Sequence, residues 1–217
     1  MEPLTEDGLM LVDKPIGWTS FDVVGKLRGG LAFALGHRVK VGHAGTLDPL
    51  ATGLLILGYG SRTRDLESLT GLDKTYTGTI RLGETTPSFD GETEVDHRSP
   101  WEHLSEALIR EVVGSFRGEL SQRPPLYSAK HHKGERAYHL ARQGATTLLD
   151  PVTIVVRSME VVAIRGAEVD IKVSCAKGTY IRSLAHDIGQ VLGCGAWLCA
   201  LCRTRIGSYE LTEARSP

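Results

Sequence analysis

Three strand-like segments follow one another without a helical pattern between them, and this cluster constrains the fold more than any other feature. They are Thr153–Val156, Met159–Ile164 and Val169–Cys175. Such runs, bounded by polar or turn-forming residues, are typical of strands. Consecutive strands argue against a regular alternation of strand, helix and strand. The sequence therefore predicts an α+β fold.

Further strand and helix patterns are scattered along the rest of the chain. Strand patterns occur at Gly8–Val12, Leu54–Gly58 and Lys74–Leu82. Apolar residues recur at helical spacing in four places, which are the segment that begins at an N-cap on Thr19 or Ser20, and the segments Ser61–Leu72, Leu104–Gly114 and Tyr180–Leu192. We expect Gly29-Gly30 to interrupt or end the first helix, and residues 39–53 to form a loop because of their glycines and proline.

The chain is long enough for one sizeable core and contains one segment with weak apolar periodicity. Its 217 residues are 41% hydrophobic, which is ordinary for a single domain. In the segment 117–151, Pro124-Pro125 opposes regular structure, and Tyr127 and Tyr138 are interleaved with basic residues. A long basic segment without its own core is more often functional than structural. We expect one domain over residues 1–217.

The amino terminus does not resemble a secretory signal, and the apolar runs are short. The amino terminus is acidic and lacks the basic start and apolar core of a secretory signal. The longest apolar run, Leu54–Leu57, is too short to span a bilayer. We expect a cytoplasmic protein without membrane contact.

Local charge is more informative than net charge. The formal net charge is -1, which does not indicate a nonspecific polyanion binder. Two stretches are nevertheless basic, and their cations are Lys26, Arg28, Arg38 and Lys40 in the first and Lys130, Lys133, Arg136 and Arg142 in the second. From charge alone, a polyanion site and two merely solvated faces both remain open.

The four cysteines do not form a convincing metal motif. Cys194, Cys199 and Cys202 have the spacing C-x4-C-x2-C, with Cys175 upstream and His186 nearby. A structural zinc site would need a second closely spaced pair, which is missing. We expect reduced thiols that pack as small apolar side chains, and no metal.

Two loops carry the residues that could perform chemistry. Asp48 lies in the glycine-rich stretch Gly42–Gly53, whose glycines allow close approach by another molecule. A carboxylate presented there could act as nucleophile or base, or could simply stabilise a turn. Arg182 follows a Gly-Thr-Tyr turn and could keep Asp48 ionised, or could form a structural ion pair. Tyr76 and His43 could contact an extruded base, or could only pack against neighbours.

Several ordered blocks resemble one known family over almost the whole chain. The blocks are D-K-P-x-G-W-T-S at Asp13–Ser20, G-H-A-G-T-L-D-P-x-A-T-G-x-L at Gly42–Leu55, K-T-Y at Lys74–Tyr76, P-P-x-Y-S-A-x-K at Pro124–Lys130, A-R-Q-G at Ala141–Gly144 and C-x-K-G-T-Y-I-R at Cys175–Arg182. In these blocks the chain is similar to the tRNA pseudouridine-55 synthases of the TruB family. The resemblance implies the pseudouridine synthase fold, with a mixed, mostly antiparallel central sheet flanked by helices and loops.

The resemblance also implies roles for individual residues. Asp48 aligns with the family's essential aspartate, Tyr76 with the tyrosine that stacks on the target uracil, and Arg182 with the arginine that pairs with the aspartate. Three residues would line the same pocket or fill the space left by flipped nucleotides: His43, Tyr180 and Leu201. Contacts to RNA are expected from Lys14, Lys130, Lys133, Arg136 and Arg142.

The implied reaction converts a uridine of the T loop, at position 55 of transfer RNA, into pseudouridine. The base must first be extruded from the folded loop. Asp48 would then promote cleavage of the glycosidic bond by attack on C1′, by attack on C6 or by removal of a sugar proton, and these three routes remain open. The reaction needs no cofactor. We expect a monomer, with residues 117–151 closing over the RNA as a mobile thumb.

Two departures from the family pattern affect the expected RNA contacts. Many members carry a further carboxy-terminal RNA-binding module, called PUA, which we do not expect in this chain. Cys202 also occupies a position where an arginine is common. We therefore expect RNA binding to depend on the two basic stretches.

Three other functions fit parts of the sequence. A synthase acting on another RNA would use the same residues, although a guide-dependent enzyme is disfavoured by the missing module. A protein that only helps transfer RNA to fold would not need Asp48 beside its anionic partner. A glycoside hydrolase would usually need two cooperating carboxylates, and the neighbourhood of Asp48 offers one.

Overall fold

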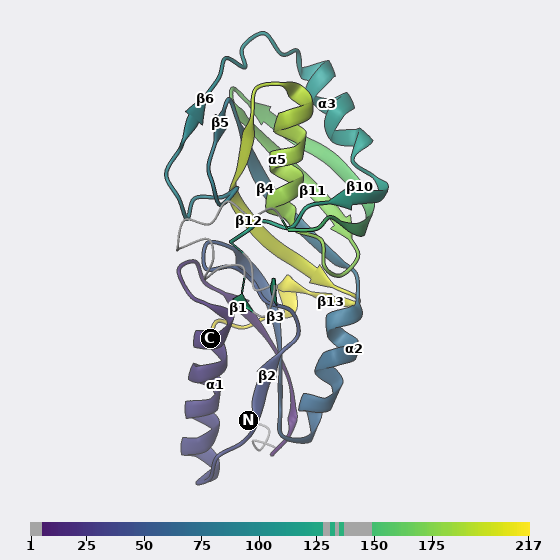
Figure 1. Cartoon of the computed structure of the whole chain (residues 1–217). Coiled ribbons are helices and arrows are strands. Elements are labelled where there is room, and N and C mark those ends of the chain that lie inside the picture. Colours follow the sequence, from purple (N-terminus) through teal and green to yellow (C-terminus); the bar gives the residue numbers. More distant parts are fainter. Residues whose placement is uncertain (1–5, 128–130, 133–134, 137–148) are drawn as a thin grey trace. The chain divides into compact units, whose positions relative to one another are not determined.

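The computed structural model describes residues 6–127, 131–132, 135–136 and 149–217. By its contacts the chain divides into two compact units, and the single domain expected over residues 1–217 stays a prediction. Unit 1 comprises Met1–Thr77 and Leu201–Pro217, and unit 2 comprises Gly78–Ala200. The chain passes from one unit to the other within the strands β4 (Lys74–Leu82) and β12 (Ala196–Ile206) (Figure 1).

Unit 1 is built around the strand β3. In chain order the elements of unit 1 are β1 (Gly8–Lys14), α1 (Ser20–Leu35), β2 (Val41–His43), β3 (Thr52–Tyr59), η1 (Gly60–Asp65), α2 (Leu66–Gly71), β13 (Tyr209–Glu210) and η2 (Leu211–Glu213). β1 and β2 both pair with β3 in antiparallel fashion, and β12 pairs with it in parallel through Cys202 and Arg203. The short strand β2 lies within the segment that the sequence predicts as a loop.

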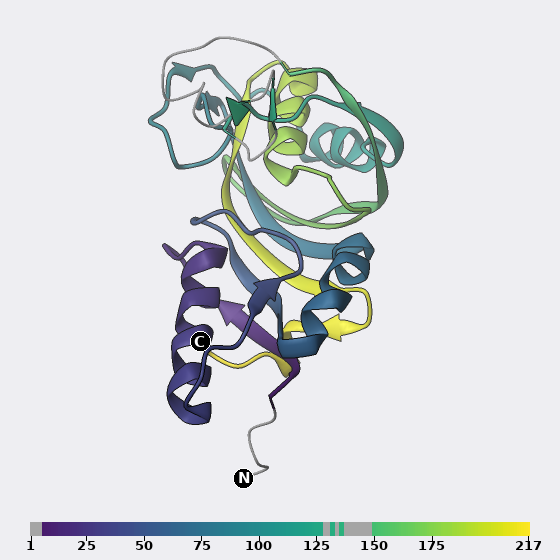
Figure 2. The ribbon, with the colours of Figure 1, turned by 60° about the horizontal axis from the view of Figure 1, so that its bottom comes forward.

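Both faces of β3 are buried, one under each helix of unit 1. Leu55 and Leu57 pack in one cluster with Val23, Val24 and Leu31 of α1. The alternate residues of β3 pack on the other face, where the cluster consists of Ala44, Leu54, Ile56, Leu69 and Ile206. Side chains alternate between the two faces of a strand, so a continuous apolar run can serve both helices. Figure 2 shows α1 and α2 on opposite sides of these strands.

Helix α1 begins as predicted but continues past its expected end. Thr19 is the N-cap, and its hydroxyl accepts a hydrogen bond from the Asp22 N–H while the Asp22 carboxylate accepts from the Thr19 N–H. This reciprocal pair is a capping box. The prediction that Gly29-Gly30 interrupts or ends the helix is wrong, because the helix runs to Leu35 and ends on Gly36.

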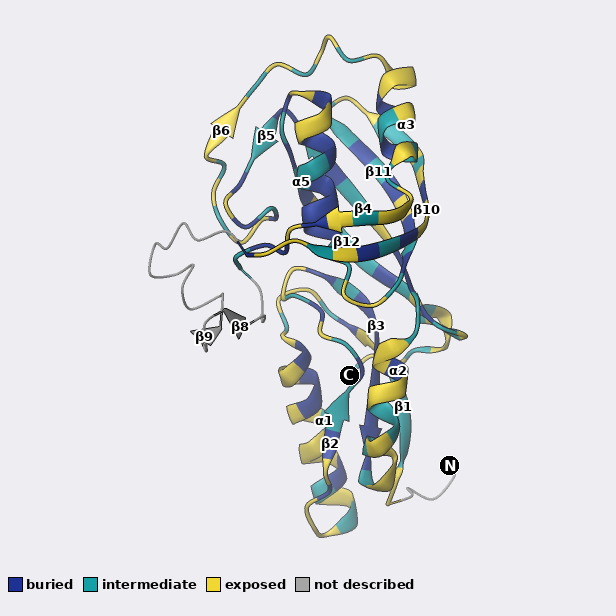
Figure 3. Ribbon diagram, turned by 45° about the vertical axis from the view of Figure 1, so that its right-hand side comes forward, coloured by how far each residue is buried: buried dark blue, intermediate teal, exposed yellow. Residues whose placement is uncertain are grey.

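Unit 2 carries two helices on antiparallel strands. Besides the ends of β4 and β12, its elements are β5 (Glu84–Thr85), β6 (His97–Arg98), α3 (Glu106–Ser115), β7 (Gly118–Gln122), β8 (His131–His132), β9 (Glu135–Arg136), β10 (Val152–Arg165), β11 (Glu168–Cys175) and α5 (Ile181–Leu192). β10 pairs with both β7 and β11 in antiparallel fashion. Helix α3 contacts β10 and α5. Most of α5 is buried, including Leu184, Ala185 and Ile188 (Figure 3).

Two details of unit 2 differ from the sequence interpretation. The predicted strands Thr153–Val156 and Met159–Ile164 are halves of the single strand β10. A register shift in the pairing with β11 lies between Val156 and Ser158, at the polar residues that separate the two predicted strands. In addition, the first part of the segment 117–151 forms β7 and pairs with β10.

The α+β prediction is confirmed by this architecture. The strands are mostly antiparallel, and helices cover them. The predicted helices at Leu104–Gly114 and Tyr180–Leu192 correspond to α3 and α5. In the described part of the chain, no helix has the length and apolar character needed to span a bilayer.

Candidate active site

Asp48 lies in the loop between β2 and β3 of unit 1. The loop begins after His43, the last residue of β2. At its start the Ala44 N–H donates to the Ile56 carbonyl of β3 at 2.9 Å. The Ala51 N–H donates to the Asp48 carbonyl at 3.1 Å and closes a tight turn. The Asp48 residue is half-buried. Its carboxylate is therefore carried on a backbone that is anchored to the core on both sides.

Ser20, the first residue of α1, fixes the loop immediately before Asp48. Its hydroxyl accepts from the Leu47 N–H at 2.9 Å and donates to the Leu47 carbonyl at 3.2 Å. Both residues are buried. Because one side chain satisfies both backbone groups of Leu47, the position of the peptide next to Asp48 is set by the start of α1.

Lys14, at the end of β1, is fully buried beside the same loop. Its ammonium donates to the carbonyls of Trp18 at 2.6 Å, Pro15 at 3.0 Å and Pro49 at 3.3 Å. This burial contradicts the prediction that Lys14 contacts RNA, because the three carbonyls occupy the ammonium and no part of the side chain reaches solvent. The lysine instead ties the Asp13–Ser20 block to the peptide that follows Asp48.

Arg203 of β12 supports the loop from within the core of unit 1. Its Nε donates to the Leu54 carbonyl at 2.7 Å and its Nη2 to the Gly45 carbonyl at 3.1 Å. The side chain is fully buried. At Gly53 a Cβ would lie 2.4 Å from the Arg203 carbonyl oxygen, so only glycine allows β3 and β12 to approach this closely.

The charges around the loop shift two pKa values. The pKa of Lys14 is lowered. Burial is the largest cause, the charge of Asp48 opposes it, and the charge of Arg203 acts in the same direction as burial. Burial also lowers the pKa of His43, and Arg203 acts in the same direction. The His43 imidazole is therefore neutral at pH 7. Asp48 is thus close enough to the buried Lys14 ammonium for its charge to act on the pKa of that group.

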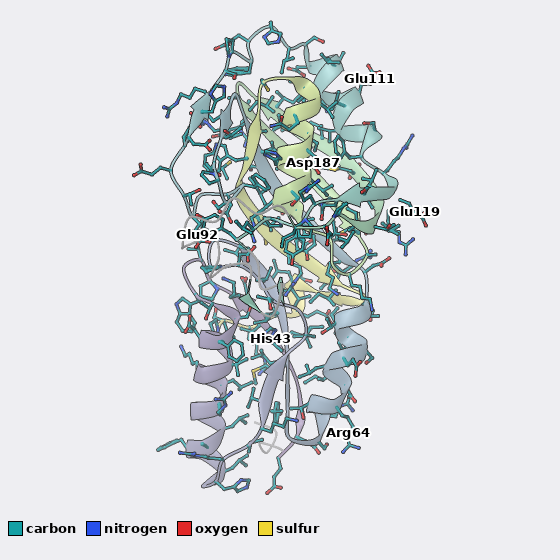
Figure 4. All side chains as sticks on the ribbon, viewed as in Figure 1. His43, Arg64, Glu92, Glu111, Glu119 and Asp187 are labelled. Carbon is teal, nitrogen blue, oxygen red and sulfur yellow. The ribbon has the colours of Figure 1, made fainter. Side chains whose placement is uncertain are left out.

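His43 has an aromatic neighbour at the start of α1. Its ring lies 5.7 Å from the Phe21 ring, centre to centre, with the two planes nearly perpendicular at 89°. Its Nδ1 atom is buried and has no hydrogen-bond partner among the described residues. Figure 4 labels His43 in unit 1. The prediction that this ring lies in the nucleotide site stays a prediction.

Tyr76 and Leu201 also belong to unit 1. Tyr76 lies in β4 and is 8% exposed, and the neighbouring Thr75 carbonyl accepts from the Thr204 hydroxyl at 3.2 Å. The Leu201 carbonyl accepts from the Thr52 hydroxyl at 3.3 Å. Both residues are therefore fixed by paired strands. Their expected contacts with a uracil are not tested by these observations.

The other two predicted pocket residues lie in unit 2. The Gln122 amide forms two hydrogen bonds with the Tyr180 backbone, at 2.8 and 2.9 Å, and so fixes the residue that precedes α5. Arg182 is 4% exposed and donates to the carbonyls of Ser88 at 3.1 Å and Tyr127 at 3.0 Å. Its guanidinium also lies 3.4 Å from the buried Asp90 carboxylate. The pairing of Arg182 with Asp48 stays a prediction.

The predicted basic residues are only partly described. Lys26, Arg28, Arg38 and Lys40 are exposed on α1 and the segment that follows it. Lys130, Lys133 and Arg142 lie outside the described residues, as does the side chain of Arg136, whose backbone forms part of β9. The described residues contain no group of three or more histidine, cysteine, aspartate or glutamate residues placed to hold a metal.

Sequence reasoning missed the residues that position the loop and the arginine. Ser20, Arg203 and Asp90 act through backbone carbonyls or an ion pair, and none has a distinctive spacing from Asp48 or Arg182. The sequence gives one hint, which is the charged Arg203 within an otherwise apolar strand. That hint does not tell which segment of the chain the arginine contacts.

Comparison with known proteins identifies the family. The family model for the N-terminal domain of TruB family pseudouridylate synthases matches residues 34–181, and that for the tRNA pseudouridylate synthase B C-terminal domain matches residues 182–216. The chain is 45% identical over 215 residues to a tRNA pseudouridine synthase B of Flavobacterium johnsoniae, which covers 98% of this chain and 94% of the relative. A protein of the same name from Parabacteroides distasonis is 46% identical over 210 residues, which is 96% of this chain and 89% of the relative.

A solved structure agrees with this result. It is an H/ACA RNP bound to a substrate RNA containing 2'-deoxyuridine, with a TM-score of 0.67 and 30% sequence identity. The match covers 94% of this chain and 48% of that chain. Together with the family models, it confirms the pseudouridine synthase fold. The chain belongs to the TruB family of pseudouridylate synthases.

Proposed function

We propose that this chain isomerises a uridine in the T loop of transfer RNA to pseudouridine, with Asp48 as the catalytic carboxylate. The observation that carries the proposal is the Asp48 loop, which Lys14, Ser20 and Arg203 hold by hydrogen bonds to its backbone. Relatives at about 45% identity are tRNA pseudouridine synthases B. A loop fixed in this way presents one carboxylate in a defined position, as catalysis requires.

The proposed reaction rearranges bonds without a net change in composition. The uridine leaves the RNA stack, at a cost of a few kcal/mol that protein contacts offset. The bond from N1 to C1′ breaks, the uracil turns, and a bond from C5 to C1′ forms. The hydrogen of C5 leaves to solvent as a proton, and N1 gains a proton. Asp48 promotes the cleavage.

The remaining pocket roles in this proposal are those that the family resemblance implies. Tyr76 provides an aromatic face for the uracil, and His43, Tyr180 and Leu201 line the space around it. Arg182 supplies a permanent positive charge, and its pairing with Asp48 remains part of the proposal. Within unit 2 the guanidinium donates to the Ser88 and Tyr127 carbonyls and lies 3.4 Å from the Asp90 carboxylate, which fixes its position.

The proposed partner is the T stem-loop of transfer RNA, bound by a monomer in the cytoplasm. The exposed cations on and after α1, together with Lys130, Lys133, Arg136 and Arg142, would neutralise phosphates. Much of the thumb predicted over residues 117–151 lies outside the described residues, and its first part, Gly118–Gln122, is the strand β7.

Release of tritium from C5 tests the reaction. A transfer RNA transcript labelled with 5-tritiated uridine should release one equivalent of tritium per RNA when the enzyme is in excess. Asp48→Asn should slow this release by about a thousandfold or more, because the variant is nearly isosteric but lacks the carboxylate. Glu67→Gln, at an exposed carboxylate of α2, is the matched control and should retain the wild-type rate. Tight RNA binding without tritium release would overturn the proposal in favour of an RNA-folding helper.

The role of Tyr76 is tested with two substitutions. Tyr76→Phe keeps the ring and Tyr76→Leu removes it, so stacking predicts that only the leucine variant loses most of its rate. Thermal unfolding of both variants should be measured alongside, because Tyr76 is buried. Equal rates of tritium release for two folded variants would show that stacking at Tyr76 is unimportant.

A further inference from the structure

Three exposed apolar side chains surround the Asp48 loop in unit 1. Ile16 is 65% exposed, Phe21 is 73% exposed and Leu50 is 39% exposed. Scattered exposed apolar residues are ordinary on protein surfaces. All three, however, lie in or next to the loop that carries Asp48, so their exposure calls for a functional explanation.

Hydrogen bonds fix each of the three next to the loop. The Gly17 N–H donates to the Pro49 carbonyl at 2.8 Å, which brings Ile16 and Leu50 to the same place. Phe21 follows Ser20, whose hydroxyl is bonded to both backbone groups of Leu47. The set of Ile16, Phe21 and Leu50 is called the apolar rim below. Its position relative to Asp48 is therefore set by backbone contacts within one unit.

Phe21 is the aromatic member of the apolar rim. Its ring meets the His43 ring at a centre-to-centre distance of 5.7 Å and an angle of 89°, yet most of its surface remains in water. On the same helix end the Lys26 ammonium lies 5.5 Å from the centre of the Trp18 ring and is exposed. The start of α1 therefore carries an exposed aromatic ring, Phe21, and an exposed cation, Lys26, which suit the base and the phosphate of a nucleotide respectively.

We propose that an unpaired base of the substrate RNA loop, other than the uridine that reacts, stacks on Phe21, with Ile16 and Leu50 covering its edge. The proposal rests on the proposed function, because it assigns a contact of the same RNA. Unstacked bases of RNA loops are bound on aromatic side chains in many RNA-binding proteins. Such a contact favours the opened loop over the closed one, and so lowers the cost of extruding the target uridine.

Substitutions at Phe21 test the proposal, with Phe33 as the matched control. Phe33 is 93% exposed in the same helix, twelve residues further on, or about 18 Å along the helix axis. Equilibrium binding of the T stem-loop RNA is measured in the Asp48→Asn chain, so that no product forms. Phe21→Ala should weaken binding by about tenfold. Phe21→Trp should bind at least as tightly as the parent chain, Phe21→Leu should be intermediate, and Phe33→Ala should have no effect.

A double-mutant cycle identifies the base. Each loop nucleotide in turn is made abasic, and the effect of Phe21→Ala is measured again. Stacking predicts one position at which the abasic RNA already binds weakly and Phe21→Ala costs nothing more. If Phe21→Ala and Phe33→Ala have equal effects, or if no abasic position removes the effect of Phe21→Ala, the proposal is overturned. Self-association of the chain that Phe21→Ala abolishes, without a change in RNA binding, would assign the rim to a second copy and overturn it as well. Tritium release by the chain with native Asp48 tests the proposed function separately.

Discussion

Lys14 shows how a basic residue near an active site can act entirely through the backbone. Its ammonium is buried and donates to the carbonyls of Pro15, Trp18 and Pro49. Lys14→Met keeps the volume of the side chain but leaves these carbonyls without a donor. We expect the free energy of unfolding to fall by about 1–3 kcal/mol, measured by urea denaturation. The exposed Lys40→Met should change it by less than about 0.5 kcal/mol. Equal stabilities of the two variants would contradict this account of Lys14.

Asp187 of α5 makes the stability depend on pH. Burial raises its pKa to about 6, above the value of about 3.9 expected in the unfolded chain. The folded state therefore prefers the protonated form, and its stabilising contribution is complete below about pH 4 and is lost as the pH rises to about 6. Asp187→Asn should consequently unfold at the same temperature as the parent chain near pH 4, and at a higher temperature at pH 7.

The expected difference for Asp187→Asn at pH 7 is about 1 kcal/mol after allowance for solvent screening of a partly exposed group, or about 2–4 °C in Tm. Glu111→Gln is the control, since Glu111 is an exposed carboxylate on α3 (Figure 4). Thermal unfolding at pH 4, 5, 6 and 7 measures both. A pH-independent difference between Asp187→Asn and the parent chain would argue against burial as the cause.

At the scale of elements, the glycines of α1 give a direct test of helix propensity. Gly29 and Gly30 lie inside the helix, and a Cβ at either position would meet nothing within 4 Å. We expect Gly29→Ala or Gly30→Ala to stabilise the chain by about 0.5–1 kcal/mol. Gly36 ends the helix with a φ of 74°, so Gly36→Ala should destabilise it by about 1 kcal/mol. Chemical denaturation checks all three, and destabilisation by the alanines at 29 and 30 would show that α1 does not behave as a continuous helix.

The same helix explains where sequence reasoning about elements succeeds and fails. Its start is encoded locally, by Thr19 and Asp22, and was predicted. Its continuation depends on Leu31, which is buried beyond the two glycines in the cluster formed with β3. Burial of one leucine is worth about 1.5–3 kcal/mol, which is comparable with the propensity cost of about 2 kcal/mol for two glycines, and Leu35 packs against the same cluster. A contact between segments far apart in sequence therefore decided the length of the helix.

The candidate site was predictable to a similar extent. The glycine-rich loop makes Asp48 a candidate, although a carboxylate there could equally stabilise a turn, and only the family resemblance assigned its role. The supports of the loop could not be found in this way. Arg203 is 155 positions from Asp48, and its bonds to Gly45 and Leu54 depend on the pairing of β12 with β3. Only the tertiary structure brings these residues together.

At the scale of the whole molecule, a nearly neutral chain is proposed to bind a polyanion through local patches. Its formal net charge is -1, while Lys26, Arg28, Arg38 and Lys40 are exposed around α1. Affinity for the T stem-loop should fall as salt rises, because each phosphate contact releases counterions. Replacement of one contacting cation, as in Arg28→Gln, should reduce the slope of log affinity against log salt by about one unit. Binding titrations from low to high salt measure the slope, with Lys172→Gln in β11 as an exposed control. An affinity that does not change with salt would contradict binding through these patches.

The central claim is that the chain places Asp48 against one uridine of transfer RNA and isomerises it. Incubation with an unmodified transfer RNA transcript, followed by mapping of pseudouridine at single-nucleotide resolution, tests it most directly. The account predicts modification confined to the T-loop uridine with the native chain, and no modification with Asp48→Asn. Modification at other positions, or undiminished modification by the Asp48→Asn variant, would contradict it.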